Sequence, residues 1–115
     1  LRYHGAGTIV SQLMKDGLME AVDLQQLDTF KAGILFAQTE GIIPAPESCH
    51  AIAATILEAN KCKETGEEKV ILFNLSGHGL IDMASYDKYL SGDLVNYSLS
   101  DEDIAENLEK IGSLA

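Results

Sequence analysis

The stretch "KVILFNLSGHG", Lys69 to Gly79, decides how this chain is interpreted. Its first part, Lys69 to Asn74, is apolar on successive residues, which predicts a strand covered on both faces, as in a parallel sheet under helices. Ser76 then follows the carboxyl end of that strand, where open α/β sheets bind their ligands. A plain glycine turn with a capping serine is the more common arrangement, so both interpretations stay open. Neither G-x-G-x-x-G nor G-K-[ST] is present, and nucleotide binding is unsupported.

Apolar periodicity outside this stretch predicts helices and one more strand. Leu18 to Val22 alternates enough for a short strand. Asp23 and Gln26 have the spacing of a capping box at the start of the next helix, and Gly33 inside that helix predicts close packing. The order is helix, strand, helix, helix, strand, helix, helix, which is the α/β class. The expected helices lie within residues 7–17, 23–41, 47–63, 82–90 and from 100 onward, the last with Ile104, Leu108 and Ile111 inward.

Two strands do not make a stable parallel sheet. The expected fold is therefore a set of helices around a short parallel sheet that is incomplete alone. We expect the missing strands to come from another chain or from a removed part of this one. Unmatched strands and apolar helix faces should also drive self-association into a dimer or a swapped oligomer.

Composition narrows the class of protein. The chain has 115 residues, which is enough for one small domain, with 46% hydrophobic and 23% charged residues. A formal net charge of −10 argues against nucleic acid as a partner. No apolar run approaches the roughly 20 residues of a membrane span. Cys49 and Cys62 form no C-x-x-C pattern and fit a reducing cytoplasm. The chain does not begin with methionine, so we expect a processed product or a fragment.

Other candidate sites are weaker. Glu47 and His50 lie three residues apart on one helix face, which is half of a di-iron pattern, but the further ligands are not in place and no metal site is expected. Ser76 has a glycine on one side only, so the nucleophile pattern G-x-S-x-G is absent and no serine triad is predicted.

Three motifs occur in a characteristic order: "LRYHG" from Leu1, "TEGIIPAPESCHAI" from Thr39, and "VILFNLSGHGLID" from Val70. Together they resemble the C-terminal part of the tryptophan synthase beta chain family, in its second, longer class. The resemblance runs from Leu1 to about Leu90. It implies a pyridoxal-phosphate (PLP) enzyme of fold type II. Residues 1–92 would then be the C-terminal portion of the PLP-dependent catalytic domain, and residues 93–115 a C-terminal helical tail.

The resemblance also implies roles for single residues. Ser76 matches the serine whose hydroxyl faces the pyridine nitrogen of PLP. Gly77 lets the backbone turn beside the ring, and Glu47 matches an acid near it. On the substrate side, Gly5 lies in the loop beside the pocket. Arg2 stands near the place of an aspartate of the better-known class, which puts that role in doubt.

Further departures concern "HGLI". His78 replaces an arginine, and Leu80 with Ile81 replaces an Asp-Lys pair, so closure of the site and pairing with the usual alpha subunit are uncertain. The lysine that holds PLP as a Schiff base follows a histidine in the family. No lysine here does so; they are Lys15, Lys31, Lys61, Lys63, Lys69, Lys88 and Lys110. We therefore expect no catalytic residue in this fragment, and its N-terminal half to be missing.

The resemblance implies that the intact enzyme joins indole to L-serine, giving L-tryptophan and water by PLP-dependent β-replacement in the cytoplasm. A homodimer is expected and the alpha subunit is a possible partner, whereas the fragment alone should be inactive. A related PLP enzyme, such as a serine or threonine deaminase or a cysteine synthase, is an alternative. A second alternative is a non-catalytic acidic binding or assembly module, in which "NLSGHG" is a plain turn.

Overall fold

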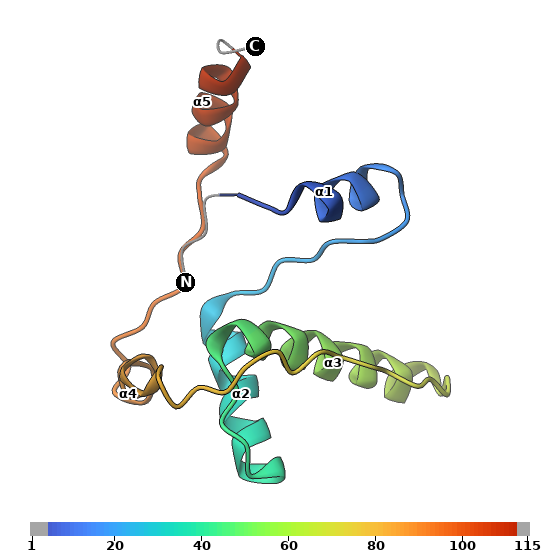
Figure 1. Ribbon diagram of the computed structural model, residues 1–115, viewed down its shortest axis with the longest axis vertical. Coiled ribbons are helices and arrows are strands. Elements are labelled where there is room, and N and C mark those ends of the chain that lie inside the picture. Colours follow the sequence, from blue (N-terminus) through green and yellow to red (C-terminus); the bar gives the residue numbers. More distant parts are fainter. Residues whose placement is uncertain (1–4, 113–115) are drawn as a thin grey trace.

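The computed structural model describes residues 5–112, and within that range the regular structure is helical (Figure 1). Helices α2 and α3 pack against each other, and α4 contacts α2. Helices α1 and α5 stand away from this pair. The bounds are Thr8–Lys15 for α1, Gln26–Glu40 for α2, Pro46–Thr65 for α3, Met83–Leu90 for α4 and Asp101–Gly112 for α5.

Glycine and proline set the ends of the two central helices. Gly41 follows α2 with a φ of 72°, and Gly66 follows α3 with a φ of 73°. Each donates its backbone N–H to a carbonyl of the last helical turn, that of Ala37 at 3.0 Å and that of Cys62 at 2.8 Å. Glycine takes this left-handed conformation without the penalty of a Cβ. Pro46 begins α3, where its fixed φ fits the first helical position.

The core lies where α2, α3 and α4 meet. Phe30 of α2, Cys49 of α3 and Tyr86 of α4 form one buried cluster. The ring of Phe30 meets that of Tyr86 edge to face, with centroids 5.1 Å apart. Gly33 lies against the same cluster, and a Cβ there would overlap Cys49 Sγ and lie 3.0 Å from Tyr86 Oη. The close packing predicted at Gly33 is therefore confirmed.

Neither expected strand is present among residues 5–112. Residues 18–22 form a turn and exposed coil, and residues 69–74 run as coil. In the second segment, Phe73 packs against the α2–α3 core and against Phe36. Val70 is 101% exposed and Leu72 is 92% exposed. The expectation of two covered faces is therefore wrong for this structure, because a strand needs a paired neighbour and the described residues supply none.

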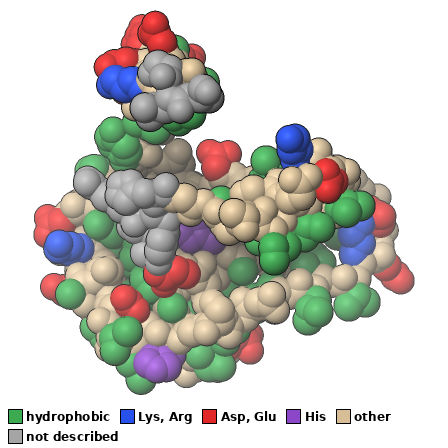
Figure 2. All heavy atoms as spheres, turned by 45° about the horizontal axis from the view of Figure 1, so that its top comes forward, with side chains coloured by type: hydrophobic (Ala, Val, Ile, Leu, Met, Phe, Trp, Pro, Cys, Tyr) green, Lys and Arg blue, Asp and Glu red, His purple; other side chains and the backbone are tan. Residues whose placement is uncertain are grey.

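The two outer helices are predicted correctly as helices, but the inward face expected for α5 is wrong. In α5, Ile104, Leu108 and Ile111 have helical spacing but are all exposed. The apolar residues of α1 are exposed in the same way, and Figure 2 shows hydrophobic side chains gathered on the surface. Helical periodicity predicts which face of a helix is apolar, but that face is buried only where another surface packs against it. The described part of the chain supplies no such surface for α1 or α5.

The start of α2 differs from the sequence prediction. Its N-cap residue is Gln25 rather than Asp23, and no side chain of the N-cap bonds to the helix. The tail supplies the partners instead. Leu27 donates its N–H to Asn96 Oδ1 at 3.0 Å, and the side chain of Gln26 donates to the carbonyl of Val95. A partner about 70 residues away has therefore taken the place of a local cap.

At α5 the local cap is present. Asp103 donates its N–H to Ser100 Oγ at 3.1 Å, and Ser100 donates its own N–H to Asp103 Oδ2 at 3.3 Å. This reciprocal pair is a capping box with aspartate in the third position. Ser100 is therefore the N-cap of α5, at the residue where the last helix was expected to begin.

Candidate functional site

The glycine-serine stretch lies against the loop that precedes α3. Ala45 donates its N–H to the carbonyl of Gly77 at 2.8 Å, and Gly79 donates to the carbonyl of Ile43 at 2.8 Å. These bonds form an antiparallel bridge between Pro44 and His78. Two motifs more than 30 residues apart in sequence are thereby joined into one backbone unit.

Ser76 is the first candidate residue of this unit, and its side chain is exposed. Its Oγ lies 3.0 Å from the Oγ of Ser48, in the first turn of α3. Ser48 is 2% exposed and also accepts the N–H of Gly77 at 3.2 Å. The structure therefore places Ser76 and Gly77 at the N-terminal end of α3, with the buried hydroxyl of Ser48 behind them.

Glu47 is the residue before Ser48, in the first turn of α3, and it is exposed. A carboxylate in this position is favoured by the helix dipole. Gly5 is exposed, and a Cβ there would meet nothing within 4 Å. Arg2 lies outside the described residues.

A hydrogen-bonded tyrosine supports the loop from the core side. Tyr86 donates its hydroxyl to the carbonyl of Pro44 at 2.5 Å, and Cys49 Sγ lies 3.3 Å from the same oxygen of Tyr86. Burial is the main cause that raises the pKa of Tyr86 well above its ordinary value, and burial likewise raises the pKa of the Cys49 thiol. Both groups are therefore neutral near pH 7 and act as structural hydrogen-bonding groups.

Gly79 is required by space at this loop. It is buried, and a Cβ there would overlap the carbonyl oxygen of Pro44 and lie 2.9 Å from Cε2 of Tyr86. Backbone atoms cannot move aside as a side chain can. The second glycine of "SGHG" therefore lets the two loops approach each other, a reason different from turn formation.

The chemistry available at this unit is hydrogen bonding by neutral groups. Among residues 5–112, no group of three or more His, Cys, Asp and Glu side chains could hold a metal ion. His50, the second residue of the E-x-x-H pattern, has its Nδ1 3.2 Å from the carbonyl of Pro46. No helix in the described part of the chain is long and apolar enough to cross a membrane.

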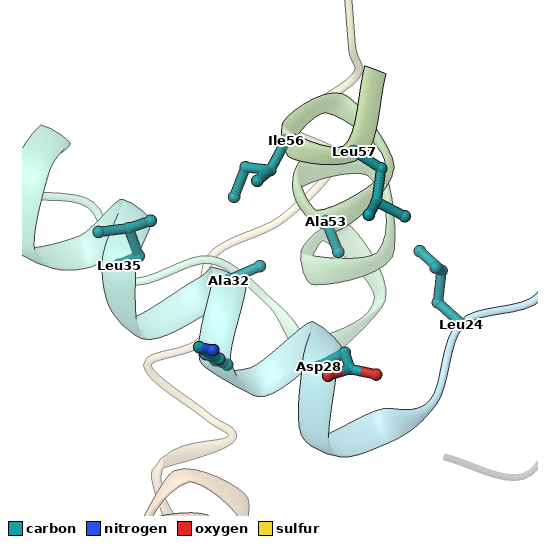
Figure 3. Close-up of a pocket in the computed structure, with 8 residues that line it drawn as sticks. Leu24, Asp28, Ala32, Leu35, Ala53, Ile56 and Leu57 are labelled. Atoms are coloured by element: carbon teal, nitrogen blue, oxygen red, sulfur yellow. The ribbon is translucent and has the colours of Figure 1, made fainter. Parts of the chain in front are cut away.

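A separate apolar groove lies between α2 and α3 (Figure 3). Its volume is about 240 Å³, and no residue of the Ser76 unit lines it. The side chains of Leu24, Leu35 and Leu57 face the hollow in Figure 3, with Asp28 at one end. The groove offers packing surface rather than reactive groups.

Sequence reasoning missed two residues of this unit, Ser48 and Tyr86. Ser48 is next to the predicted Glu47, yet a serine in the first turn of a helix usually serves the helix itself. For Tyr86, the sequence predicts only a place in the expected helix at residues 82–90. The polar tip of a buried tyrosine needs a partner, and that requirement was the available signal for a contact with a loop.

Comparison with known proteins supports the resemblance of the motifs. No protein-family model matches the chain. The chain is 60% identical over 96 residues to tryptophan synthase beta chain 2 of Aquifex aeolicus. These matched residues make up 84% of the chain and 22% of that protein. It is 64% identical over 94 residues to the protein of the same name from Methanosarcina mazei, covering 82% of the chain and 21% of that protein.

A third relative extends the match. Tryptophan synthase beta chain 2 of Pyrococcus furiosus is 49% identical over 108 residues, which cover 94% of the chain and 24% of that protein. The chain therefore spans less than a quarter of the length of these relatives, which agrees with the prediction of a fragment. By sequence, this chain is homologous to a short segment of the tryptophan synthase beta chains.

Proposed function

We propose that this chain is the C-terminal segment of a tryptophan synthase beta chain, and that the whole protein condenses indole with L-serine to give L-tryptophan and water. The observation that carries the proposal is the identity of 60% over 96 residues to a protein of that name. The motifs around Glu47 and Ser76 supply the second support, because they meet in space at one loop.

The residues at this loop fit pyridoxal phosphate as cofactor. Ser76 presents an exposed hydroxyl, and Gly77 beside it packs against Ala45, since an added Cβ would lie 3.4 Å from the Cβ of Ala45. In the proposed arrangement Ser76 donates a hydrogen bond to the pyridine nitrogen. Glu47 contributes a carboxylate from the adjacent helical turn. When bound, the cofactor supplies electron withdrawal from the carbons next to the substrate's amino group.

A neutral serine at the pyridine nitrogen has a chemical consequence. A hydroxyl donates a hydrogen bond without transferring its proton, whereas a carboxylate would hold the ring nitrogen as a cation and strengthen electron withdrawal. The weaker withdrawal suits elimination and replacement at the β-carbon of serine. This match of residue and reaction supports tryptophan synthesis within the proposal.

The segment supplies only one side of the active site in this proposal. The lysine that anchors the cofactor, the phosphate-binding loop and the remaining strands belong to the rest of a fold type II chain. The exposed side chains of Val70 and Leu72 fit a segment that pairs with those strands in the whole protein. We include in the proposal a homodimer in the cytoplasm and an alpha subunit as a further partner.

The test uses the full-length protein that contains this segment. With pyridoxal phosphate, L-serine and indole it should form L-tryptophan, detected by chromatography and mass. Omission of the cofactor and omission of indole are the controls. Pyruvate from L-serine with no tryptophan would favour a deaminase. Absence of any reaction and of any cofactor spectrum would favour a non-catalytic module.

The 115-residue chain alone gives a second, independent test. It should form no tryptophan. Borohydride reduction in the presence of pyridoxal phosphate should leave no stoichiometric label on a single lysine. A specific label on one of its seven lysines would show a cofactor anchor inside this segment and would overturn this part of the proposal.

A further inference from the structure

The buried hydroxyl of Ser48 has three polar neighbours in the Ser76 loop. It accepts the N–H of Gly77 at 3.2 Å, and its Oγ lies 3.0 Å from Ser76 Oγ and 3.5 Å from the carbonyl oxygen of Gly77. At 2% exposure, Ser48 must satisfy its own proton within the protein. The acceptor of the Ser48 proton therefore determines whether Ser76 accepts or donates in their contact.

The distances favour one direction for the Ser48 proton. A hydroxyl has one proton to donate and two lone pairs to accept with. One lone pair of Ser48 already accepts the N–H of Gly77. The carbonyl of Gly77 is 3.5 Å away and already accepts the N–H of Ala45 at 2.8 Å. Either hydroxyl can donate across the 3.0 Å contact; because Ser76 Oγ is the nearer acceptor for the Ser48 proton, we infer that Ser48 donates to Ser76.

This direction fixes the role of Ser76. Because its oxygen accepts from Ser48, its own proton must point away from Ser48. The side chain of Ser76 is exposed, so that proton points toward the side of the loop open to a ligand. A chain of two hydroxyls polarises the outer one and makes it a better donor. Donation is the function that an unprotonated ring nitrogen requires.

We propose that Ser48 is a positioning residue that holds Ser76 as a hydrogen-bond donor toward the cofactor's pyridine nitrogen. This inference rests on the proposed function, since it takes pyridoxal phosphate as the ligand of Ser76. Ser48 itself does not touch the cofactor. Its effect passes through one hydroxyl contact, and that contact can be tested separately from the backbone bond to Gly77.

The experiment uses the full-length protein loaded with pyridoxal phosphate and compares four forms: wild type, Ser48→Ala, Ser76→Ala and the double variant. The readouts are the absorption spectrum of the bound cofactor and its dissociation constant by titration. Ser48→Ala should shift the absorption maximum in the same direction as Ser76→Ala. It should weaken cofactor binding by about threefold to tenfold, the range of one hydrogen bond.

The double variant separates the two possible roles of Ser48. If Ser48 acts through Ser76, its removal from the Ser76→Ala protein should change the dissociation constant by less than about twofold. If it acts only through the N–H of Gly77, the two effects should multiply, which would overturn the inference. Thr29→Val is the matched control, because it removes another buried hydroxyl, which donates to the carbonyl of Gln26 within α2.

The remaining outcomes are distinct. An unchanged spectrum and affinity in Ser76→Ala would overturn the proposed function itself. A changed Ser76→Ala with an unchanged Ser48→Ala would overturn only the role of Ser48. If Ser48→Ala does not fold, Ser48→Cys keeps a side chain of similar size with a weaker donor and should give a smaller shift in the same direction. No shift in that folded variant would contradict the inference.

Discussion

Replacement of Gly33 by alanine tests the packing beneath the Ser76 loop. Gly33 lies inside α2, and an added Cβ would overlap Cys49 Sγ and lie 3.0 Å from Tyr86 Oη. Cys49 is 0% exposed, and its sulfur lies 3.3 Å from the hydroxyl of Tyr86. The sulfur therefore has little room to move aside. Because Tyr86 also holds the carbonyl of Pro44, strain at this point should reach the loop.

Two effects of opposite sign determine how much Gly33→Ala changes the free energy of unfolding. Alanine is favoured over glycine in a helix interior by about 1 kcal/mol. Overpacking of a close-packed core costs about 1–3 kcal/mol. With the sulfur held in place we expect the upper part of that range, and a net loss of about 1–2 kcal/mol. A loss of that size corresponds to a roughly 5- to 30-fold increase in the population of locally open molecules.

Hydrogen exchange followed by mass spectrometry on the full-length protein measures this effect locally. Peptides from α2 and α3 of Gly33→Ala should exchange roughly 5- to 30-fold faster, and peptides from α5 should be unchanged. Cys49→Ala alone should cost about 1 kcal/mol, as for one buried methyl group. The double variant should return close to wild type, because the new methyl occupies the space of the sulfur.

Cys62→Ala is the matched control, since Cys62 is the second free cysteine of α3 and is only half-buried. It should not rescue Gly33→Ala. Slower exchange in Gly33→Ala than in wild type would show that helix propensity outweighs the contact, and the packing argument would be wrong. A double variant as unstable as the sum of its parts would show that Cys49 is not the obstacle.

Two further predictions follow from exposure and ionisation. Because folding raises the pKa of Tyr86, mainly through burial, the unfolded state ionises first as the pH rises past about 10, and the free energy of unfolding falls. In urea melts, Tyr86→Phe should lose less of its free energy of unfolding between pH 7 and pH 10.5 than wild type does. At pH 7 the substitution should lower the free energy of unfolding by about 1–2 kcal/mol, because it removes the donor to the carbonyl of Pro44. An equal loss between the two pH values in both proteins would contradict this prediction. The 115-residue chain alone should self-associate through its exposed apolar side chains. Light scattering should show weaker self-association for the double variant Val70→Lys/Leu72→Lys than for wild type. A monodisperse wild-type monomer would refute this prediction.

The helices were predictable because their signals are local. Gly41 stops α2 at the end expected from the sequence, and α3 runs from Pro46 to Thr65, close to its expected bounds of 47 and 63. Ser100 and Asp103 cap α5 through a reciprocal bond over three residues. Each of these effects needs only the neighbouring turn of the chain. The helix bounds therefore follow from the sequence to within a few residues.

The strands and the buried faces were not predictable in this way. A strand is defined by its partner, and the apolar run at Lys69 to Asn74 says that a partner is needed without saying where it is. In the structure Phe73 packs on the helices while Val70 and Leu72 face outward. The described residues 5–112 therefore show the expected helices and neither expected strand.

The residues of the candidate site differ in the same way: local sequence signals identify one of them, and a contact distant in sequence defines the other. Ser76 could be found because it precedes the two glycines of "SGHG" and because the motif resembles a known family. Ser48 could not, since its bond to Ser76 joins residues 28 apart and depends on how α3 meets the loop. The loop keeps this geometry without a sheet because the N–H groups of Ala45 and Gly79 and the hydroxyl of Tyr86 all bond across it. The segment therefore carries a preformed loop with the exposed hydroxyl of Ser76 and the packing that holds it, while the proposed reaction needs residues that lie beyond the segment.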